Sequence, residues 1–154
     1  MIRLAAAEEA ETLTALINLA FRAERFFATG ERIDLDEVRE HFSTGVFLVA
    51  EESGAIDGCV YVEIRSDRGY FGLLSVDPAR QGAGIGSRLV TSAEDYCRER
   101  ACRVMDLEVV NLRAELPPFY ERRGYSGTTT APFPSNVETT LPCHFICMSK
   151  PLNA

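Results

Sequence analysis

The chain has 154 residues, of which 46% are hydrophobic and 25% charged, the proportions of a soluble globular protein of about one domain. These values exclude a disordered chain or a fibrous repeat, and no apolar run reaches the ~18–20 residues of a membrane helix. Five cysteines, an odd number, and an N-terminus without the apolar core of a signal peptide favour a reduced compartment. We therefore expect a single cytoplasmic domain over residues 1–154.

The net charge of −7 is unevenly distributed along the chain. Residues 1–77 carry 7 basic and 15 acidic side chains, whereas residues 78–154 carry 9 basic and 8 acidic ones. Such a chain lacks the basic surface that non-specific nucleic-acid binding needs, and anionic membranes would repel it. We expect neither partner. The asymmetry favours an anionic ligand on the C-terminal half and a cationic one on the N-terminal half, with solvated surface charge as the alternative.

The first half of the chain is predicted to contain two helices followed by three strands. A short strand over residues 2–4 precedes an amphipathic helix over residues 8–22. Residues 23–30 break that pattern and form a loop that contains Phe26 and Phe27. A second helix over residues 34–42 begins at Asp34, which is the N-cap because Glu37 follows three residues later. The β-branched and aromatic runs at 46–51, 59–64 and 70–76 indicate an antiparallel meander.

The second half is predicted to alternate helices and strands. Apolar residues at helical spacing predict a helix over residues 86–100, and a strand follows over residues 104–110. Pro117 and Pro118 begin a short helix that Gly124 ends. Residues 126–142 are irregular or extended, and residues 143–150 form a last strand. This order predicts an α/β sandwich with a mixed sheet around a central β-α-β unit.

A glycine-rich turn between residues 76 and 87 carries the clearest functional signal. Gly82, Gly84 and Gly86 stand between a predicted strand and a predicted helix, where glycine lets the backbone approach a bulky anion. The helix dipole adds partial positive charge at the same end. Arg80 and Arg88 flank the turn, and no acid occurs between residues 78 and 93. The turn therefore predicts a phosphate or pyrophosphate site.

Other glycine motifs fit this turn less well. A nucleotide-triphosphatase loop needs a lysine after its second glycine, and the only lysine of this chain is Lys150. The dinucleotide fingerprint G-x-G-x-x-G has its third glycine one residue later, where Ser87 stands here. A turn that binds nothing is a further alternative.

The motif Val76-x-Pro78-x-x-Gln81-x-x-Gly84-x-Gly86 resembles the acetyl-CoA signature V-x-P-x-x-[RQ]-x-x-G-x-[GA] of the GNAT family of N-acetyltransferases. Residues 119–125 resemble the family's Y-x-x-x-G-[FY] segment, and the order of elements agrees along nearly the whole chain. The resemblance implies a three-layer α/β sandwich with a mixed, mostly antiparallel sheet of six to seven strands. Its central β-α-β unit would bind acetyl-CoA, and a homodimer is the expected assembly.

The resemblance also implies which residues contact acetyl-CoA. Backbone groups of Leu74 and Val76 would pair with the pantetheine arm, and Asn111 would hydrogen-bond it further along. Tyr120 matches the tyrosine that protonates the departing thiolate, although it lies nine residues after the asparagine and many relatives have seven. Its ordinary pKa near 10 leaves it able to donate at neutral pH, and simple packing on the sheet is the alternative. The pyrophosphate would be held by backbone N–H groups of Gln81, Gly82, Ala83, Gly84, Ile85, Gly86 and Ser87.

The catalytic base is less defined, because Tyr70 stands where histone-type members have a glutamate, and tyrosine is a poor base. Glu63, which shares strand alternation with Tyr61, is the first candidate, and Glu108 is the second. A water relay or an amine that arrives neutral would need no carboxylate. The expected acceptor pocket comprises Phe26, Phe27, Tyr61 and Tyr70.

The expected function is therefore transfer of an acetyl group from acetyl-CoA to a primary amine in a ternary complex, with a cationic acceptor favoured. A non-catalytic acyl-CoA-binding or sensing domain on the same scaffold is the alternative. No metal site is expected, because Cys143 and His144 point to opposite faces of a strand and the chain has only two histidines.

Overall fold

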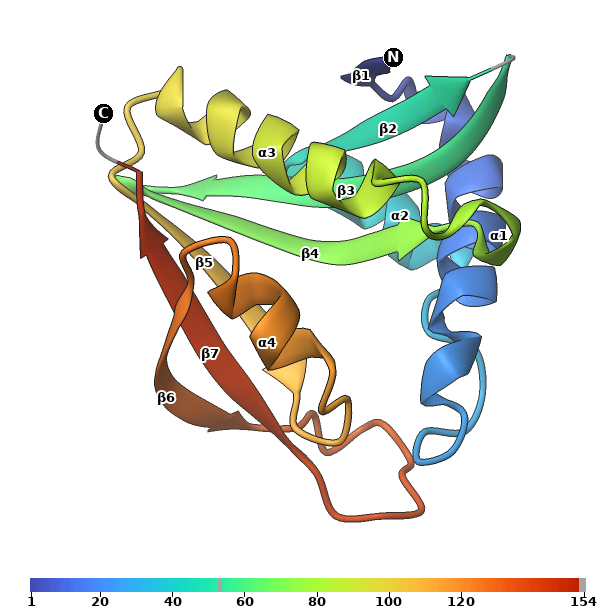
Figure 1. Ribbon diagram of the computed structural model, residues 1–154. Helices are drawn as coiled ribbons and strands as arrows, with labels where there is room; N and C mark the ends of the chain where they lie inside the picture. Colours follow the sequence, from blue (N-terminus) through green and yellow to red (C-terminus); the bar gives the residue numbers. More distant parts are fainter. Residues whose placement is uncertain (53, 153–154) are drawn as a thin grey trace.

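The computed structural model describes residues 1–52 and 54–152, which form one seven-stranded sheet with helices on both faces (Figure 1). The strand order is β1-β2-β3-β4-β5-β7-β6. The strands are β1 (Ile2–Leu4), β2 (Val46–Glu52), β3 (Ala55–Arg65), β4 (Arg68–Val76), β5 (Val104–Val110), β6 (Ser126–Pro132) and β7 (His144–Pro151). The helices are α1 (Ala10–Ala20), α2 (Leu35–Thr44), α3 (Ile85–Arg98) and α4 (Leu116–Glu121), with 3-10 turns η1 (Ala7–Glu9), η2 (Phe21–Glu24) and η3 (Pro78–Arg80).

The predicted sandwich and mixed sheet are confirmed, and the differences lie at the ends of elements. The helix expected over residues 8–22 is divided, because 3-10 turns occupy both of its ends. The N-cap prediction is confirmed: the Asp34 carboxylate accepts a hydrogen bond from the Glu37 N–H at 2.8 Å. Helix α4 ends at Glu121, three residues before Gly124, whose φ of +95° turns the chain toward β6.

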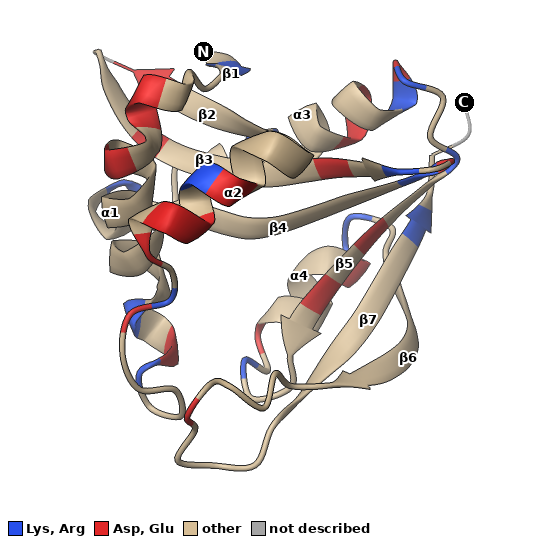
Figure 2. Ribbon diagram, turned by 180° about the vertical axis from the view of Figure 1, so that it is seen from behind, with Lys and Arg blue, Asp and Glu red and all other residues tan. Residues whose placement is uncertain are grey.

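Two hydrophobic clusters sandwich the sheet. Helices α1 and α2 cover one face around Leu13, Ile17 and Val38, and α3 and α4 cover the other around Leu89 and Tyr120. Figure 2 shows acidic residues on α2 and around the start of α1. In the residues that the structure describes, no helix is long and apolar enough to cross a membrane.

The parallel pairing of β4 and β5 extends over three residue pairs only. Residues 68–70 of β4 pair with residues 104–106 of β5, and beyond this point the two strands diverge (Figure 1). A bidentate ion pair between Arg68 and Asp106, with both N···O distances 2.7 Å, joins the strands at the paired end. The sheet therefore opens like a V, with β1–β4 in one arm and β5–β7 in the other.

A β-bulge in β4 reverses which side chains face each helical layer. Cys59 pairs with Ser75 and Tyr61 with Gly72, so β4 has one residue more than β3 in this interval. Leu73, the bulged residue, has a φ of +55°. Its side chain packs toward α1, whereas Phe71 before it and Leu74 after it pack toward α3. The strict alternation of a regular strand is thereby broken at this point.

A buried polar cluster ties α3 to the far arm of the V. Glu94, only 5% exposed, accepts a hydrogen bond from the Tyr125 hydroxyl at 2.7 Å and pairs with the Lys150 ammonium at 3.1 Å. Burial and the Glu94 carboxylate raise the pKa of Tyr125. The cluster lies between α3 and β7, so it helps to hold the arm that carries β6 and β7 against α3, the helix of the β-α-β unit.

Replacing Glu94 by leucine is expected to lower the free energy of unfolding by about 2 kcal/mol, because the buried Tyr125 hydroxyl loses its acceptor and the half-buried Lys150 ammonium loses its counter-charge. Urea denaturation measures this change. Glu99→Leu on the exposed end of the same helix is the matched control and is expected to change stability by no more than about 0.5 kcal/mol. Equal effects of the two substitutions would contradict the role assigned to the cluster.

Candidate active site

A cleft of about 570 Å³ occupies the space where β4 and β5 diverge. The glycine turn lines one end, the bulged part of β4 and helix α4 line the middle, and η2 with the end of β5 lines the other end. We call the first end the anion arm and the last the acceptor arm. One continuous cleft thus joins the two regions that the sequence assigns to different ligands.

The anion arm is built from the turn that begins α3. Gly82 and Gly84 have φ values of +90° and +77°, a region that side chains disfavour, and a Cβ at either position would meet nothing within 4 Å. Gly84 is the N-cap of α3, so the N–H groups of the first helical turn lack intrahelical acceptors. Of the predicted contact residues, Gln81, Gly82, Gly84, Ile85, Gly86 and Ser87 line the cleft, and Ala83 does not. The turn is therefore an open backbone cradle of the kind that binds phosphate groups.

The two arginines beside this cradle share one acidic partner. Arg80 and Arg88 pair with opposite oxygens of Glu52, at 3.0 Å and 3.2 Å. Arg80 also lies 3.7 Å from Asp57 Oδ2, a buried oxygen without a hydrogen-bond donor. Only Arg80 lines the cleft. Glu52 thus holds Arg80 at the edge of the cradle and Arg88 behind it.

The bulged segment of β4 forms the middle wall. Leu73, Leu74 and Val76 line the cleft, as does Gly72, where a Cβ would lie 2.7 Å from the Tyr70 hydroxyl. A bulge leaves the backbone of its extra residue outside the regular ladder. The wall can therefore offer backbone hydrogen bonds to a ligand that lies along it.

Tyr120 reaches the middle of the cleft from α4. It is 5% exposed, and the rings of Phe71, Phe119 and Tyr125 lie 5.0–5.9 Å from its own. Burial raises the pKa of its hydroxyl to about 12, against a smaller opposite effect of nearby arginines. In the described chain the hydroxyl makes no hydrogen bond, although it lines the cleft. A hydroxyl with this pKa stays protonated well above neutral pH and can therefore donate a proton.

The acceptor arm carries acidic, basic and aromatic side chains. Glu24 of η2 pairs with Arg113 at 3.3 Å, and burial raises the pKa of its carboxyl. Glu108 of β5 lines the same space. Tyr70 of β4 also lines the arm. Burial and the charge of Glu108 raise the pKa of its phenol. This arm can bind a polar ligand and accept a proton from it.

The structure places Glu63 and Tyr61 away from the cleft. The Glu63 carboxylate accepts hydrogen bonds from the Tyr61 hydroxyl and from Arg65 Nε, both at 2.5 Å. The Tyr61 ring packs in the layer under α2, where its hydroxyl also contacts Thr44 at 2.6 Å. Glu63 pairs across β3 and β4 with Tyr70, which lines the cleft, but neither Glu63 nor Tyr61 lines it.

Phe26, Phe27 and Asn111 do not line the cleft either. Phe27 is fully buried, and Phe26 is 54% exposed. Asn111 Oδ1 accepts a hydrogen bond from the His144 backbone N–H at 2.8 Å, so this side chain joins the end of β5 to β7. Of the expected acceptor residues, Tyr70 alone lines the cleft.

Several cleft residues had no signal in the sequence. Glu24 and Arg113 are 89 positions apart, and Arg32 and Phe133 come from loops that periodicity does not describe. No motif connects such segments. Only the closure of the sheet brings them to one place.

Comparison with known proteins places these features in a family. The model of the Acetyltransferase (GNAT) family matches residues 11–125. The chain is 33% identical over 92 residues to the blasticidin-S acetyltransferase of Streptomyces morookaense, which covers 58% of this chain and 66% of that protein. It is 32% identical over 82 residues to the IAA acetyltransferase of Azospirillum brasilense, which covers 52% of this chain and 54% of that protein. The chain spans about half the length of the first curated relatives it matches.

A solved structure shows the same fold over the whole chain. The yncA protein of Salmonella typhimurium, described as a putative acetyltransferase with its cofactor acetyl-CoA, superposes with a TM-score of 0.80. The two share 21% sequence identity, and the match covers 100% of this chain and 94% of that one. Because the family model matches well over half of the residues, and the fold agrees along the full length, the chain belongs to the GNAT family of acetyltransferases.

Proposed function

We propose that the protein is an acetyl-CoA-dependent N-acetyltransferase that moves an acetyl group directly to a primary amine in a ternary complex. One observation carries this proposal: a single cleft joins the glycine cradle at the start of α3 to a tyrosine hydroxyl without a hydrogen-bond partner and to carboxylates beyond it. The family and the acetyl-CoA complex of the Salmonella structure support the donor.

The residues of the anion arm and of β4 would hold acetyl-CoA. The cradle from Gln81 to Ser87 offers its backbone N–H groups to the pyrophosphate, and Arg80 adds positive charge at the edge. Leu74 and Val76 follow the bulge along the wall and can pair with an extended pantetheine arm as an added strand would. Asn111 has only its amide NH₂ left for the role that the family pattern suggests, because its oxygen is bonded to β7.

Two side chains would handle the protons of the transfer. The amine nitrogen bonds to the acetyl carbon, the carbon–sulfur bond breaks, and the acetyl group leaves on nitrogen as an amide. Glu108 receives the proton that the amine loses, and the Tyr120 hydroxyl gives a proton to the departing sulfur. A backbone N–H of the bulge at Leu73 polarises the thioester carbonyl. Proton exchange with water then restores the Glu108 carboxylate and the Tyr120 phenol, so the sum is amine plus thioester to amide plus thiol.

Glu108 fits the role of base better than Glu63 does. Glu108 lines the cleft and has no ion pair or hydrogen bond among the described residues, whereas Arg65 and Tyr61 occupy the carboxylate of Glu63. Glu24 also lines the cleft, but Arg113 neutralises it. A carboxylate that is exposed to the cleft and free of a cation is the one that can accept a proton.

A binding or sensing domain is the second candidate, because β4 carries Tyr70 in place of a carboxylate. One measurement distinguishes the two functions. Release of CoA thiol in the presence of a panel of amines supports the enzyme, and tight acetyl-CoA binding without release by any amine supports the sensing domain.

Replacing Gly86 by valine is expected to weaken acetyl-CoA binding at least tenfold, since the side chain enters the cradle. The fold is expected to remain, because a Cβ at Gly86 meets nothing closer than Val76 Cγ2 at 3.8 Å and Gly86 has no positive φ. Calorimetry measures the affinity and circular dichroism the fold. A folded variant with unchanged affinity would refute the assignment of the cradle.

Tyr120→Phe is expected to lower kcat about 100-fold with little change in KM for acetyl-CoA, because the hydroxyl acts when charge develops on sulfur. Since burial raises the pKa of Tyr120 to about 12, the wild-type rate is expected to show no decline from its ionisation below about pH 11. Thiol release across pH checks both statements. An unchanged kcat where chemistry limits the rate would assign Tyr120 to packing.

Glu108→Gln is expected to lower kcat/KM most at neutral pH and progressively less as the pH approaches the pKa of the amine, because a neutral amine needs no base. Glu63→Gln is the matched comparison on the neighbouring layer and is expected to leave the pH–rate profile unchanged. A loss confined to the Glu63 variant would reverse the assignment of the two carboxylates.

A further inference from the structure

A strap closes the outer side of the acceptor arm. The segment of residues 133–143 between β6 and β7, which we call the strap, crosses to the loop after η2 (Figure 1). The Thr140 N–H donates to the Phe27 carbonyl at 2.7 Å, and Ala28 and Thr139 form an antiparallel bridge. The Thr29 N–H donates to the Glu138 carbonyl at 3.3 Å. These backbone bonds join the two arms of the V at its open end.

The strap gives the acceptor arm an apolar wall. Phe133, Pro134 and Val137 of the strap line the cleft, together with Phe145 of β7 and Phe21 of η2. The rings of Phe133 and Phe145 lie 5.0 Å apart. An acceptor in this arm must therefore fit behind a closed strap and against apolar side chains, which favours a small molecule over a lysine on a folded protein.

Most charges on the acceptor arm are already paired. Arg113 contacts Glu24 at 3.3 Å and Glu115 at 2.8 Å, and Arg25 contacts Glu31 at 3.4 Å. These pairs leave the arm without the acidic excess that the N-terminal half of the sequence suggested. These paired residues therefore provide no net electrostatic attraction for a cationic ligand.

Two charges on the arm have no partner. Arg32 and Glu108 make neither a hydrogen bond nor an ion pair with any described residue, and both line the cleft. The Arg32 guanidinium lies 5.3 Å from the centroid of the Phe21 ring, on the η2 side. Glu108 belongs to β5 and lines the same cleft as Arg32 and Tyr70. The charge of Glu108 raises the pKa of the Tyr70 phenol and that of Arg32 lowers it, and the Glu63–Arg65 pair acts on it in the same two directions.

We propose that the acceptor is a small amine that carries its own carboxylate, an α-amino acid with an apolar side chain or a close analogue. Arg32 binds the carboxylate, Glu108 faces the amino group, and the apolar wall of the strap takes the side chain. This proposal rests on the proposed acetyl transfer and names its acceptor class. A zwitterion places opposite charges beside the two unpaired side chains, whereas a polyamine would bring a second positive charge to Arg32.

The test compares matched amines. CoA thiol release is measured with the L-amino acids and with the corresponding amines that lack the carboxylate, such as L-phenylalanine against phenethylamine, and with spermidine and a lysine-rich folded protein. The best amino acid is expected to exceed its decarboxylated partner at least tenfold in kcat/KM. Equilibrium binding of the same amines to the CoA-saturated protein, measured by calorimetry, is expected to give the same ranking independently of turnover.

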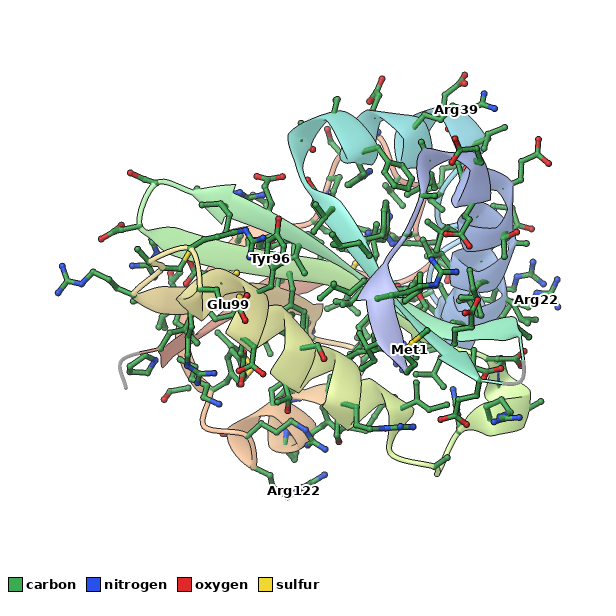
Figure 3. All side chains as sticks on the ribbon, turned by 90° about the horizontal axis from the view of Figure 1, so that it is seen from above. Met1, Arg22, Arg39, Tyr96, Glu99 and Arg122 are labelled. Carbon is green, nitrogen blue, oxygen red and sulfur yellow. The ribbon has the colours of Figure 1, made fainter. Side chains whose placement is uncertain are left out.

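Arg32→Gln tests the assigned residue. It is expected to raise KM for the amino acid about 10- to 100-fold, as loss of a charge-assisted hydrogen bond to a carboxylate does, without changing the affinity for acetyl-CoA or the rate with the decarboxylated amine. Arg22→Gln is the matched control: Arg22 is an exposed arginine of the 3-10 turn η2, lies outside the cleft and points outward from the end of α1 (Figure 3). It is expected to behave as the wild type.

The outcomes distinguish a wrong acceptor class from a wrong assignment of acetyl transfer. If spermidine, a decarboxylated amine or the protein lysines are the best acceptors, or if Arg32→Gln and Arg22→Gln have equal effects, the acceptor class is overturned while acetyl transfer stands. If acetyl-CoA does not bind, the proposed function itself fails. If acetyl-CoA binds and no amine is turned over, calorimetry decides the acceptor class alone, and equal binding of an amino acid and its decarboxylated partner overturns it.

Discussion

The divergence of β4 and β5 is the constraint on which the rest of the structure depends. Two parallel strands that remained paired along their length would leave no room for a ligand, and here pairing stops after Tyr70. The paired end is closed tightly: Arg68 binds Asp106, and a Cβ at Gly69 would lie 2.5 Å from the sulfur of Cys97 on α3. Beyond that end the bulge at Leu73 turns side chains to new faces, and the strands separate around the cleft.

Polar side chains are used differently at the two ends of the V. At the closed end the Glu94 carboxylate, the Lys150 ammonium and the Tyr125 hydroxyl satisfy one another, so the buried charges hold α3 and β7 together. In the cleft, by contrast, Tyr120, Glu108 and Arg32 have no partner among the described residues. Arg32 and Glu108 are solvent-exposed, so their charges are open to a ligand rather than buried without a partner. The grouping of these three polar side chains in one cleft supports the binding role proposed for it.

The net charge of the chain reflects the side chains on its outer surface and not those that line the cleft. Of the 15 acidic residues in residues 1–77, Glu24 and Glu31 line the cleft, and the other 13 do not, among them Asp36, Glu37 and Glu40 on α2 (Figure 2). Within the cleft, basic and acidic side chains alternate and mostly pair. At physiological salt a charge acts over roughly 8 Å, so the few side chains that line the acceptor arm decide its preference and the acidic helices contribute little.

The sequence by itself determined the features that neighbouring residues specify. The strand, glycine turn and helix from Val76 to Arg98 depend on φ angles and helix capping, and the motif around Tyr120 depends on one short helix; both are local, and periodicity and spacing predict them. Tertiary structure alone decided that Glu108 lines the cleft, whereas the Glu63 carboxylate is bonded to Tyr61 and Arg65. It also decided that Glu24 meets Arg113, 89 residues away, and that the strap binds residues 27–29. Alternation assigns a side chain to one face of the sheet or the other. Which residues of either face line the cleft depends on a bulge and on strand divergence, and these arise only when distant segments pack together.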